Sequence, residues 1–147
     1  FDTIIFKLED SVKDTESLFI DHRSKNLYVI SKREEPVFLY ELKYPQVGGD
    51  TLTAYKVLSL PFTEIVSADC ISKHGDILMK NYKKIYYWEN ENGEDVRTLL
   101  KRHPYEIPYE EEPQGEAISW AADGSGFYTL SEKKKKQRSY LYFYSKN

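Results

Sequence analysis

The most informative segment of this sequence is Glu16-Ser-Leu-Phe-Ile-Asp-His-Arg-Ser-Lys-Asn-Leu-Tyr-Val-Ile-Ser31. Two later segments repeat its pattern: Val66-Ser-Ala-Asp-Cys-Ile-Ser-Lys-His-Gly-Asp-Ile-Leu-Met-Lys-Asn81 and Glu116-Ala-Ile-Ser-Trp-Ala-Ala-Asp-Gly-Ser-Gly-Phe-Tyr-Thr-Leu-Ser131. Glu16 and Glu116 stand 100 positions apart, and the middle copy begins halfway between them. The chain therefore carries three copies of one unit, and a fixed period of about fifty residues is typical of repeat architectures.

Each copy reads as a strand, a polar turn and a second strand. The turns, at 23–26, 73–76 and 123–126, contain Asn, Gly or Asp. These residues tolerate the positive φ that tight hairpins require. Each copy is therefore expected to begin with a β-hairpin.

Further strands are expected after each hairpin. Aromatic segments follow at 37–40, 85–88 and 140–144, and a fourth apolar segment follows in the first two copies, at 52–58 and 95–101. Four strands with a period of about 40–50 residues are typical of a propeller blade. The sequence predicts an all-β propeller of three four-stranded antiparallel blades, approximately 16–58, 66–101 and 116–144.

The third copy lacks a fourth strand of its own. We expect the segment 3–8 to supply it, as an outer strand displaced to the N-terminus, within a single domain of residues 1–147. Three blades do not close a ring, since propellers need at least about four. The expected assembly is a six-bladed ring, completed by a second copy (a homodimer) or by a missing half, because an isolated half would expose apolar blade faces.

Composition narrows the class of protein. The net charge of −3 argues against nucleic acid as a partner, and no apolar run is long enough for a membrane span. The single cysteine, Cys70, excludes an internally disulfide-stapled module but leaves the compartment open.

Short motifs resemble a known superfamily. The stretches 71–78 (Ile-Ser-Lys-His-Gly-Asp-Ile-Leu) and 120–128 (Trp-Ala-Ala-Asp-Gly-Ser-Gly-Phe-Tyr) are similar to the S-P-D-G-x-x-[IL] hairpin of TolB-like six-bladed propellers, without its proline. The stretches 15–18 and 113–118 resemble the glutamate-led inner strands of secreted lactonase-like and phytase-like propellers. This resemblance implies a six-bladed ring and favours a secreted or extracellular location.

Candidate functional residues follow from the strand directions. In a blade, the start of the first strand and the end of the second lie at one channel mouth. This places Glu16, Asp69 and Glu116 together with Lys32, Tyr82 and Glu132, while the turn histidines His22 and His74 fall at the opposite end. We expect Glu16, Glu116, Lys32, Tyr82 and Glu132 to form a ligand-binding surface. The proline-rich segment 103–113 leads into Glu116, and is expected either to contact the ligand or only to connect two blades.

Two functions are consistent with this surface. The first is a binding or scaffold module that presents the channel mouth to a ligand or partner. The alternative is a calcium-dependent hydrolase of lactonase-like or phytase-like type, in which Glu16, Asp69 and Glu116 hold Ca²⁺. The opposing interpretation of these carboxylates is that backbone donors or a neighbouring cation satisfy each one. No catalytic residue is assigned, and the chain could also be a structural part of a larger protein.

Overall fold

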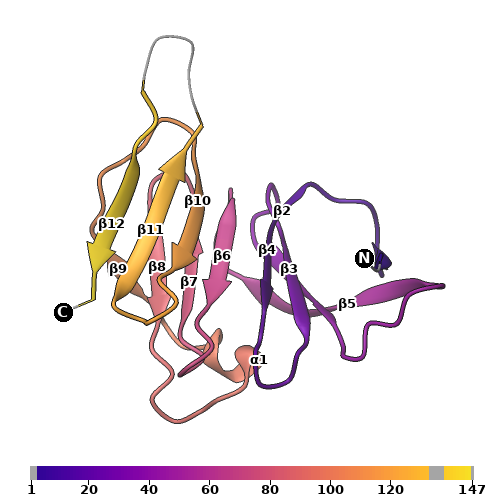
Figure 1. Ribbon diagram of the computed structural model, residues 1–147. Helices are drawn as coiled ribbons and strands as arrows, with labels where there is room; N and C mark the ends of the chain where they lie inside the picture. The colour runs from indigo at the N-terminus through magenta and orange to yellow at the C-terminus, as the bar shows by residue number, and fades with distance from the viewer. Residues whose placement is uncertain (1–2, 133–137, 147) are drawn as a thin grey trace.

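The computed structural model describes residues 3–132 and 138–146, and this part of the chain is almost entirely β-structure. Its strands form three sheets, each built on an antiparallel meander, with one short helix between β8 and β9 (Figure 1). The prediction of an all-β fold is confirmed.

The first sheet has the strand order β1-β5-β4-β3-β2 and is strongly curled. Its strands are β1 (Ile5–Leu8), β2 (Thr15–Ile20), β3 (Leu27–Ser31), β4 (Val37–Leu42) and β5 (Thr51–Leu60). The register between β4 and β5 shifts at Leu39 and Tyr40. Such a bulge increases the local twist and bends the strand, which suits the curl of this sheet.

The second and third sheets are simpler. The second has the order β6-β7-β8-β9, with β6 (Ser67–Cys70), β7 (Ile77–Lys80), β8 (Ile85–Trp88) and β9 (Tyr105–Ile107). The third has the order β10-β11-β12, with β10 (Gly115–Trp120), β11 (Gly126–Ser131) and β12 (Leu141–Ser145). All three predicted hairpins and all three aromatic third strands are confirmed.

The fourth strand of the second unit was predicted wrongly. Residues 95–101 contain the helix α1 (Val96–Leu99) instead of a strand, and β9 takes the fourth position. The Asp95 side chain accepts hydrogen bonds from the backbone N–H groups of Arg97 and Thr98, which is an N-cap. Because Val96 and Leu99 then point into the core, a helix buries the same apolar residues that suggested a strand.

The predicted place of the N-terminal strand is also wrong. Segment 3–8 does form a strand, but β1 pairs in parallel with β5 of the first sheet, with Ile5 opposite Thr51. It does not complete the third sheet, in which β12 is an edge strand among the described residues. A sequence pattern identifies a strand, whereas its partner is set by tertiary contacts.

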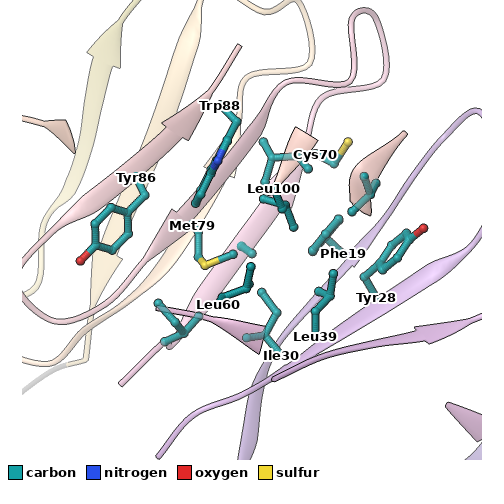
Figure 2. Close-up of a cluster of buried hydrophobic side chains, with 14 of the residues drawn as sticks. Phe19, Tyr28, Ile30, Leu39, Leu60, Cys70, Met79, Tyr86, Trp88 and Leu100 are labelled. Atoms are coloured by element: carbon teal, nitrogen blue, oxygen red, sulfur yellow. The ribbon is translucent and has the colours of Figure 1, made fainter. Parts of the chain in front are cut away.

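The first strands of the three units lie side by side. β6 contacts β2 on one side and β10 on the other, so the sheets follow one another in a row (Figure 1). Apolar side chains fill the space between consecutive sheets. The largest cluster lies between the first and second sheets and includes Phe19, Ile30, Leu39, Met79 and Trp88 (Figure 2). Full burial of such a side chain contributes roughly 1.5–3 kcal/mol.

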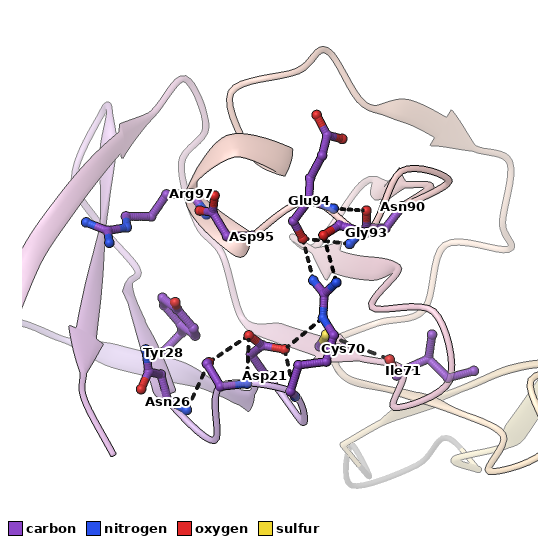
Figure 3. A network of polar contacts seen from close by, with 12 residues as sticks. Asp21, Asn26, Tyr28, Cys70, Ile71, Asn90, Gly93, Glu94, Asp95 and Arg97 are labelled. Atoms are coloured by element: carbon purple, nitrogen blue, oxygen red, sulfur yellow. Dashed lines mark hydrogen bonds and ion pairs between the residues drawn. The ribbon is translucent and has the colours of Figure 1, made fainter. Parts of the chain in front are cut away.

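Polar contacts also join neighbouring sheets at their hairpin-turn end. Arg23, in the first turn, donates to the carbonyl of Gly93 (2.8 Å) and to that of Glu94, and Asp21 caps the same turn (Figure 3). In the next seam, the Lys146 Nζ atom contacts the buried carboxylate of Asp76 at 2.9 Å. These contacts tie both outer sheets to the second sheet.

None of the helical residues that the structure describes forms a helix that could cross a membrane.

Candidate functional site

Two glutamates occupy equivalent bulges at one end of the molecule. The register of β2 on β3 skips Glu16, and that of β10 on β11 skips Glu116. A bulge leaves the extra residue outside the ladder and redirects its side chain. The equivalent position of the second sheet carries Val66, which is buried. The sequence repeat therefore places two carboxylates, not three, at matching positions.

The two glutamates are linked by contacts that cross all three sheets. The Lys32 Nζ atom lies 2.6 Å from a Glu16 carboxylate oxygen. The same Nζ atom is 5.2 Å from the ring centroid of Tyr82, and the Tyr82 hydroxyl donates to Glu116 at 2.7 Å. We call these four residues the strand-end cluster. They are four of the five residues predicted from sequence as a ligand-binding surface.

The cluster holds Lys32 as a cation. Burial acts to lower the pKa of Lys32, but the hydrogen bond to Glu16 and the nearby Tyr82 hydroxyl outweigh it, so this pKa is raised. The Lys32 side chain is only 7% exposed. The pKa of Tyr82 is raised as well: Lys32 acts to lower it, while burial and the hydrogen bond to Glu116 raise it further. Tyr82 is therefore a neutral donor at physiological pH.

A hollow of about 450 Å³ lies beside the cluster. It is lined by Lys32, Arg33, Glu35, Thr63, Glu64 and Tyr82. Glu64 adopts a left-handed backbone conformation (φ 58°) and donates its N–H to the Lys32 carbonyl at 2.7 Å. Gln114 has nearly the same φ (55°) exactly one repeat later. The same left-handed conformation therefore occurs shortly before the first strand of the second sheet and of the third. It is a feature of the connection between consecutive sheets and is not specific to the hollow.

The proline-rich segment, residues 103–113, contacts the strand-end cluster through Tyr109. The Tyr109 hydroxyl donates to the Tyr82 carbonyl at 2.5 Å. Lys80, which is fully buried, donates to the Gly115 carbonyl at 2.8 Å and lies 3.3 Å from the Tyr109 hydroxyl. Segment 103–113 thus supplies β9 and connects the second sheet to the third, and its contact with a ligand stays a prediction.

Lys80 is the most perturbed amine of this region. Burial lowers its pKa to about 8, although Glu112, Glu111 and Glu116 act in the opposite direction. Its Nζ atom is enclosed and already hydrogen-bonded to neutral acceptors, so it does not reach a ligand in the hollow. We assign it a structural role.

Glu112 is buried next to Lys80. Among the described residues, neither of its carboxylate oxygens has a hydrogen-bond partner, and the buried Thr129 hydroxyl has none either. Burial raises the pKa of Glu112, against the opposing effects of Thr129 and Lys80. A Cβ atom at Gly115 would lie 2.9 Å from the Glu112 Cβ atom and 3.1 Å from Lys80 Nζ, so glycine leaves room for both side chains.

Two predicted site residues lie outside the cluster. Asp69 accepts hydrogen bonds from the Trp120 N–H (2.7 Å) and the Ser119 hydroxyl (3.0 Å), and so ties β6 to β10. Glu132 is exposed and donates its backbone N–H to Gln114. It lines a separate hollow with Arg138, Tyr140 and Tyr142.

The proposed calcium ligands are not brought together. Glu16 pairs with Lys32, Glu116 with Tyr82, and Asp69 with donors on β10. Within residues 3–132 and 138–146, no group of three or more His, Cys, Asp or Glu side chains is arranged to hold a metal ion. Glu16, with a neighbouring cation, and Asp69, with a backbone donor, match the opposing interpretation, whereas Glu116 accepts from a tyrosine hydroxyl instead.

Sequence reasoning missed the residues of the hollow and those beneath it. Two sequence signals could have pointed to these residues. Arg33 directly follows the predicted Lys32, and Glu64 lies at the repeat position that Gln114 occupies fifty residues later. The repeat places Lys80 at the position of Ile30, which faces the next sheet, but nothing in the pattern shows that a charged amine is enclosed there.

No protein-family model matches the chain, and no curated protein is significantly similar to it in sequence.

Proposed function

We propose that the chain is a β-propeller-type module, of the TolB-like kind, that binds a ligand or partner at the strand-end cluster and its hollow. Three features support this proposal. Antiparallel units recur in sheets of five, four and three strands, their first strands lie side by side, and the cluster joins residues from all three units at one end. Functional groups on strand ends and adjoining loops of a rigid scaffold are typical of binding sites.

The charges favour a cationic ligand. Lys32 and Arg33 are already paired, with Glu16 and with Asp14 (2.5 Å). Glu35 and Glu64 form no ion pair with any described residue, so the hollow retains unpaired negative charge. A hollow of about 450 Å³ lies within the range of roughly 300–1,000 Å³ that is usual for small ligands and side chains. The proposed ligand is therefore a peptide segment with lysine or arginine side chains.

The observation that carries the proposal is the continuous line of contacts from Glu16 through Lys32 and Tyr82 to Glu116. It fixes the long Lys32 side chain in place, so that little conformational entropy is lost there on binding. A preorganised surface, beside carboxylates that pair with no described cation, suits the recognition of a cationic side chain.

Calorimetric titration with two capped peptides tests the proposal. The cationic probe is acetyl-Gly-Arg-Gly-Lys-Gly-amide, and the anionic probe is acetyl-Gly-Glu-Gly-Asp-Gly-amide. We expect the cationic peptide to bind more tightly, and Glu64→Gln to weaken its binding at least about fivefold, since about 1.4 kcal/mol corresponds to tenfold. The substitution is compatible with the backbone, because Gln114 occupies the same left-handed position one repeat later.

Glu106→Gln is the matched control. Glu106 is an exposed carboxylate on β9 that pairs with Lys84 and lies outside the hollow. Its loss should leave the affinity unchanged. Equal binding of both peptides, or an equal effect of the two substitutions, would remove the basis for the proposed site.

The calcium-dependent hydrolase is not proposed as a second function. No observation favours it, because Glu16, Asp69 and Glu116 are engaged by three separate sets of donors. The strand-end cluster also contains no base paired with a nucleophile.

A further inference from the structure

A hollow of about 690 Å³ lies between the outer strands of the first and second sheets. It is lined by residues 58–62, 84, 86, 100–104 and 106, and we call it the outer hollow. It shares no lining residue with the hollow beside the strand-end cluster. Its volume lies within the range of roughly 300–1,000 Å³ that is usual for ligand sites.

The floor of the outer hollow is apolar and aromatic. Leu60, Tyr86 and Leu100 belong to the core between the first and second sheets (Figure 2). The half-buried Phe62 packs on Tyr86, with the two ring centroids 4.4 Å apart. Because the core fixes this floor, an apolar side chain can be buried on it without rearrangement of the protein.

The rim of the outer hollow is basic, although the chain has a net charge of −3. The exposed cations Lys84, Lys101 and Arg102 line it, against the carboxylate of Glu106. Lys84 pairs with Glu106, and Arg102 with Glu94, each at 2.8 Å. Lys101 forms no ion pair with any described residue. Since exposed ion pairs are weak, the rim as a whole favours an acidic ligand.

The basic rim is held in place by the second sheet and α1. The Trp88 indole N–H donates to the Arg102 carbonyl at 2.9 Å, and the Arg102 backbone N–H donates to the Leu99 carbonyl at 3.0 Å. The Arg102 guanidinium also donates to the Glu89 carbonyl at 3.3 Å. Lys101 therefore stands on an ordered backbone, so little backbone entropy is lost there when a ligand binds.

One wall of the outer hollow is a free strand edge. β5 has ten residues, and β1 pairs only with Thr51–Ala54 of this strand. From Val57 to Leu60, no described strand pairs with the side of β5 opposite β4. Part of this free edge, from Leu58 to Leu60, lines the hollow. Such an edge can take up an extended peptide through main-chain hydrogen bonds.

We propose that the outer hollow binds an extended acidic peptide in which apolar side chains alternate with Asp or Glu. Successive side chains of a strand point to opposite sides. A peptide added along the free edge of β5 therefore buries its apolar side chains on the floor, around Phe62 and Tyr86, while its carboxylates meet the basic rim. This site goes beyond the proposed function, which concerns a cationic ligand in a different hollow.

Calorimetric titration of the whole chain with three capped peptides tests the proposal. The probe is acetyl-Glu-Phe-Glu-Phe-Glu-amide. The neutral acetyl-Gln-Phe-Gln-Phe-Gln-amide lacks its charge, and acetyl-Glu-Gly-Glu-Gly-Glu-amide lacks its apolar side chains. We expect the probe to bind at least about tenfold more tightly than either of them. Equal affinity for the probe and either control peptide would overturn the proposal.

Phenylpropionate distinguishes a peptide from a small aromatic acid. It offers one ring and one carboxylate but no backbone that could pair with β5. We expect it to bind at least about tenfold more weakly than the acidic probe. Equal affinity would show that the peptide backbone contributes nothing, which would contradict the assigned occupant.

A charge reversal at the rim locates the binding. Lys101→Glu should weaken binding of the acidic probe at least about tenfold, since an exposed residue is changed and the core is left intact. Lys43→Glu is the matched control: it makes the same charge change at an exposed lysine outside the hollow and should leave the affinity unchanged. No effect of Lys101→Glu, or an equal effect of both variants, would refute the proposed site.

Chemical-shift mapping on the unmodified chain locates the site without any substitution. The acidic probe should shift the amide resonances of Leu58, Ser59 and Lys101. Shifts confined to Lys32 and Tyr82 would mean that it binds at the strand-end cluster, and would overturn the proposal. Failure here leaves the cationic-peptide titration as a separate test, because the two hollows have no lining residue in common.

Discussion

A lysine that replaces an apolar residue in a repeated position illustrates how single residues depart from the repeat. Lys80 corresponds to Ile30 in the first sheet and to Leu130 in the third, yet it is fully buried between sheets. Its amine is satisfied by the Gly115 carbonyl and Tyr109. The pattern predicts that this position faces the next sheet, but only the three-dimensional structure shows that a charged group is enclosed there.

The pH dependence of stability should reveal this buried amine. The pKa of Lys80 is lowered from 10.5 to about 8 in the folded chain. The cost of burying its charge is therefore fully present below pH 8 and is relieved as the pH rises toward 10.5, where the unfolded chain binds the proton more strongly. Between pH 7 and 9.5, the unmodified protein should gain about 2 kcal/mol of unfolding free energy relative to Lys80→Met.

Urea unfolding of both proteins at the two pH values measures this difference. Lys101→Met, which alters an exposed lysine after α1, is the control and should run parallel to the unmodified protein. If the Lys80→Met and unmodified proteins show parallel pH profiles as well, the buried-amine account is wrong.

The proximity of the strand-end residues could be predicted from the sequence, whereas their role in binding stays a prediction. Glu16 and Lys32 were grouped because a first strand begins where the second ends, and the 2.6 Å contact follows from that geometry. Asp69 was grouped with them although it stands off the register, and the structure places it in mid-strand, opposite Leu78. A shift of a few positions along a strand moves a side chain to another layer and often to another face.

At the level of elements, local signals predicted hairpins well and pairing less well. The turns carry residues with positive φ, such as Lys25, Gly75 and Gly124, as the hairpins require. Segment 95–101 was misassigned because its apolar spacing suits both a short helix and a strand, whereas the N-cap at Asp95 decides for helix. The parallel pairing of β1 with β5 joins residues more than forty positions apart, which no local pattern specifies.

The seam between the second and third sheets depends on one buried carboxylate. Asp76 accepts from the Asn90 N–H, the Tyr87 hydroxyl and Lys146 Nζ, each at 2.9 Å. Although burial raises the pKa of Asp76, these three donors lower it below its ordinary value of 3.8. Asp76→Asn should reduce the unfolding free energy at pH 7 by roughly 1.5–3 kcal/mol, as expected for hydrogen bonds to a charged group.

The stabilisation by the Asp76 carboxylate should also disappear in acid. A lowered folded pKa means that the stabilisation is present above pH 3.8 and is lost as the pH falls through the folded value. The difference in unfolding free energy between the unmodified protein and Asp76→Asn, measured by urea unfolding, should therefore become smaller below about pH 4. Glu91→Gln, in the exposed loop before α1, should show no such gap, and a gap that is constant with pH would contradict the ion-pair explanation.

At the scale of the molecule, the repeat predicted units and faces, while the ends of the row required the structure. Both end faces were expected to be open. The structure closes one of them with the N-terminal segment around Leu8 and leaves the other, around Tyr128, exposed. This asymmetry is invisible in the pattern, because the covering segment lies outside the three copies.

Chemical-shift mapping can show whether the repeat assembles one binding site from all three sheets. The ¹⁵N-labelled chain would be titrated with the cationic pentapeptide described above. We expect amide shifts in all three units at this end of the molecule, at Lys32, Glu64, Tyr82 and Glu116. Shifts concentrated instead at the opposite end, around Arg23 and Gly93, would contradict it.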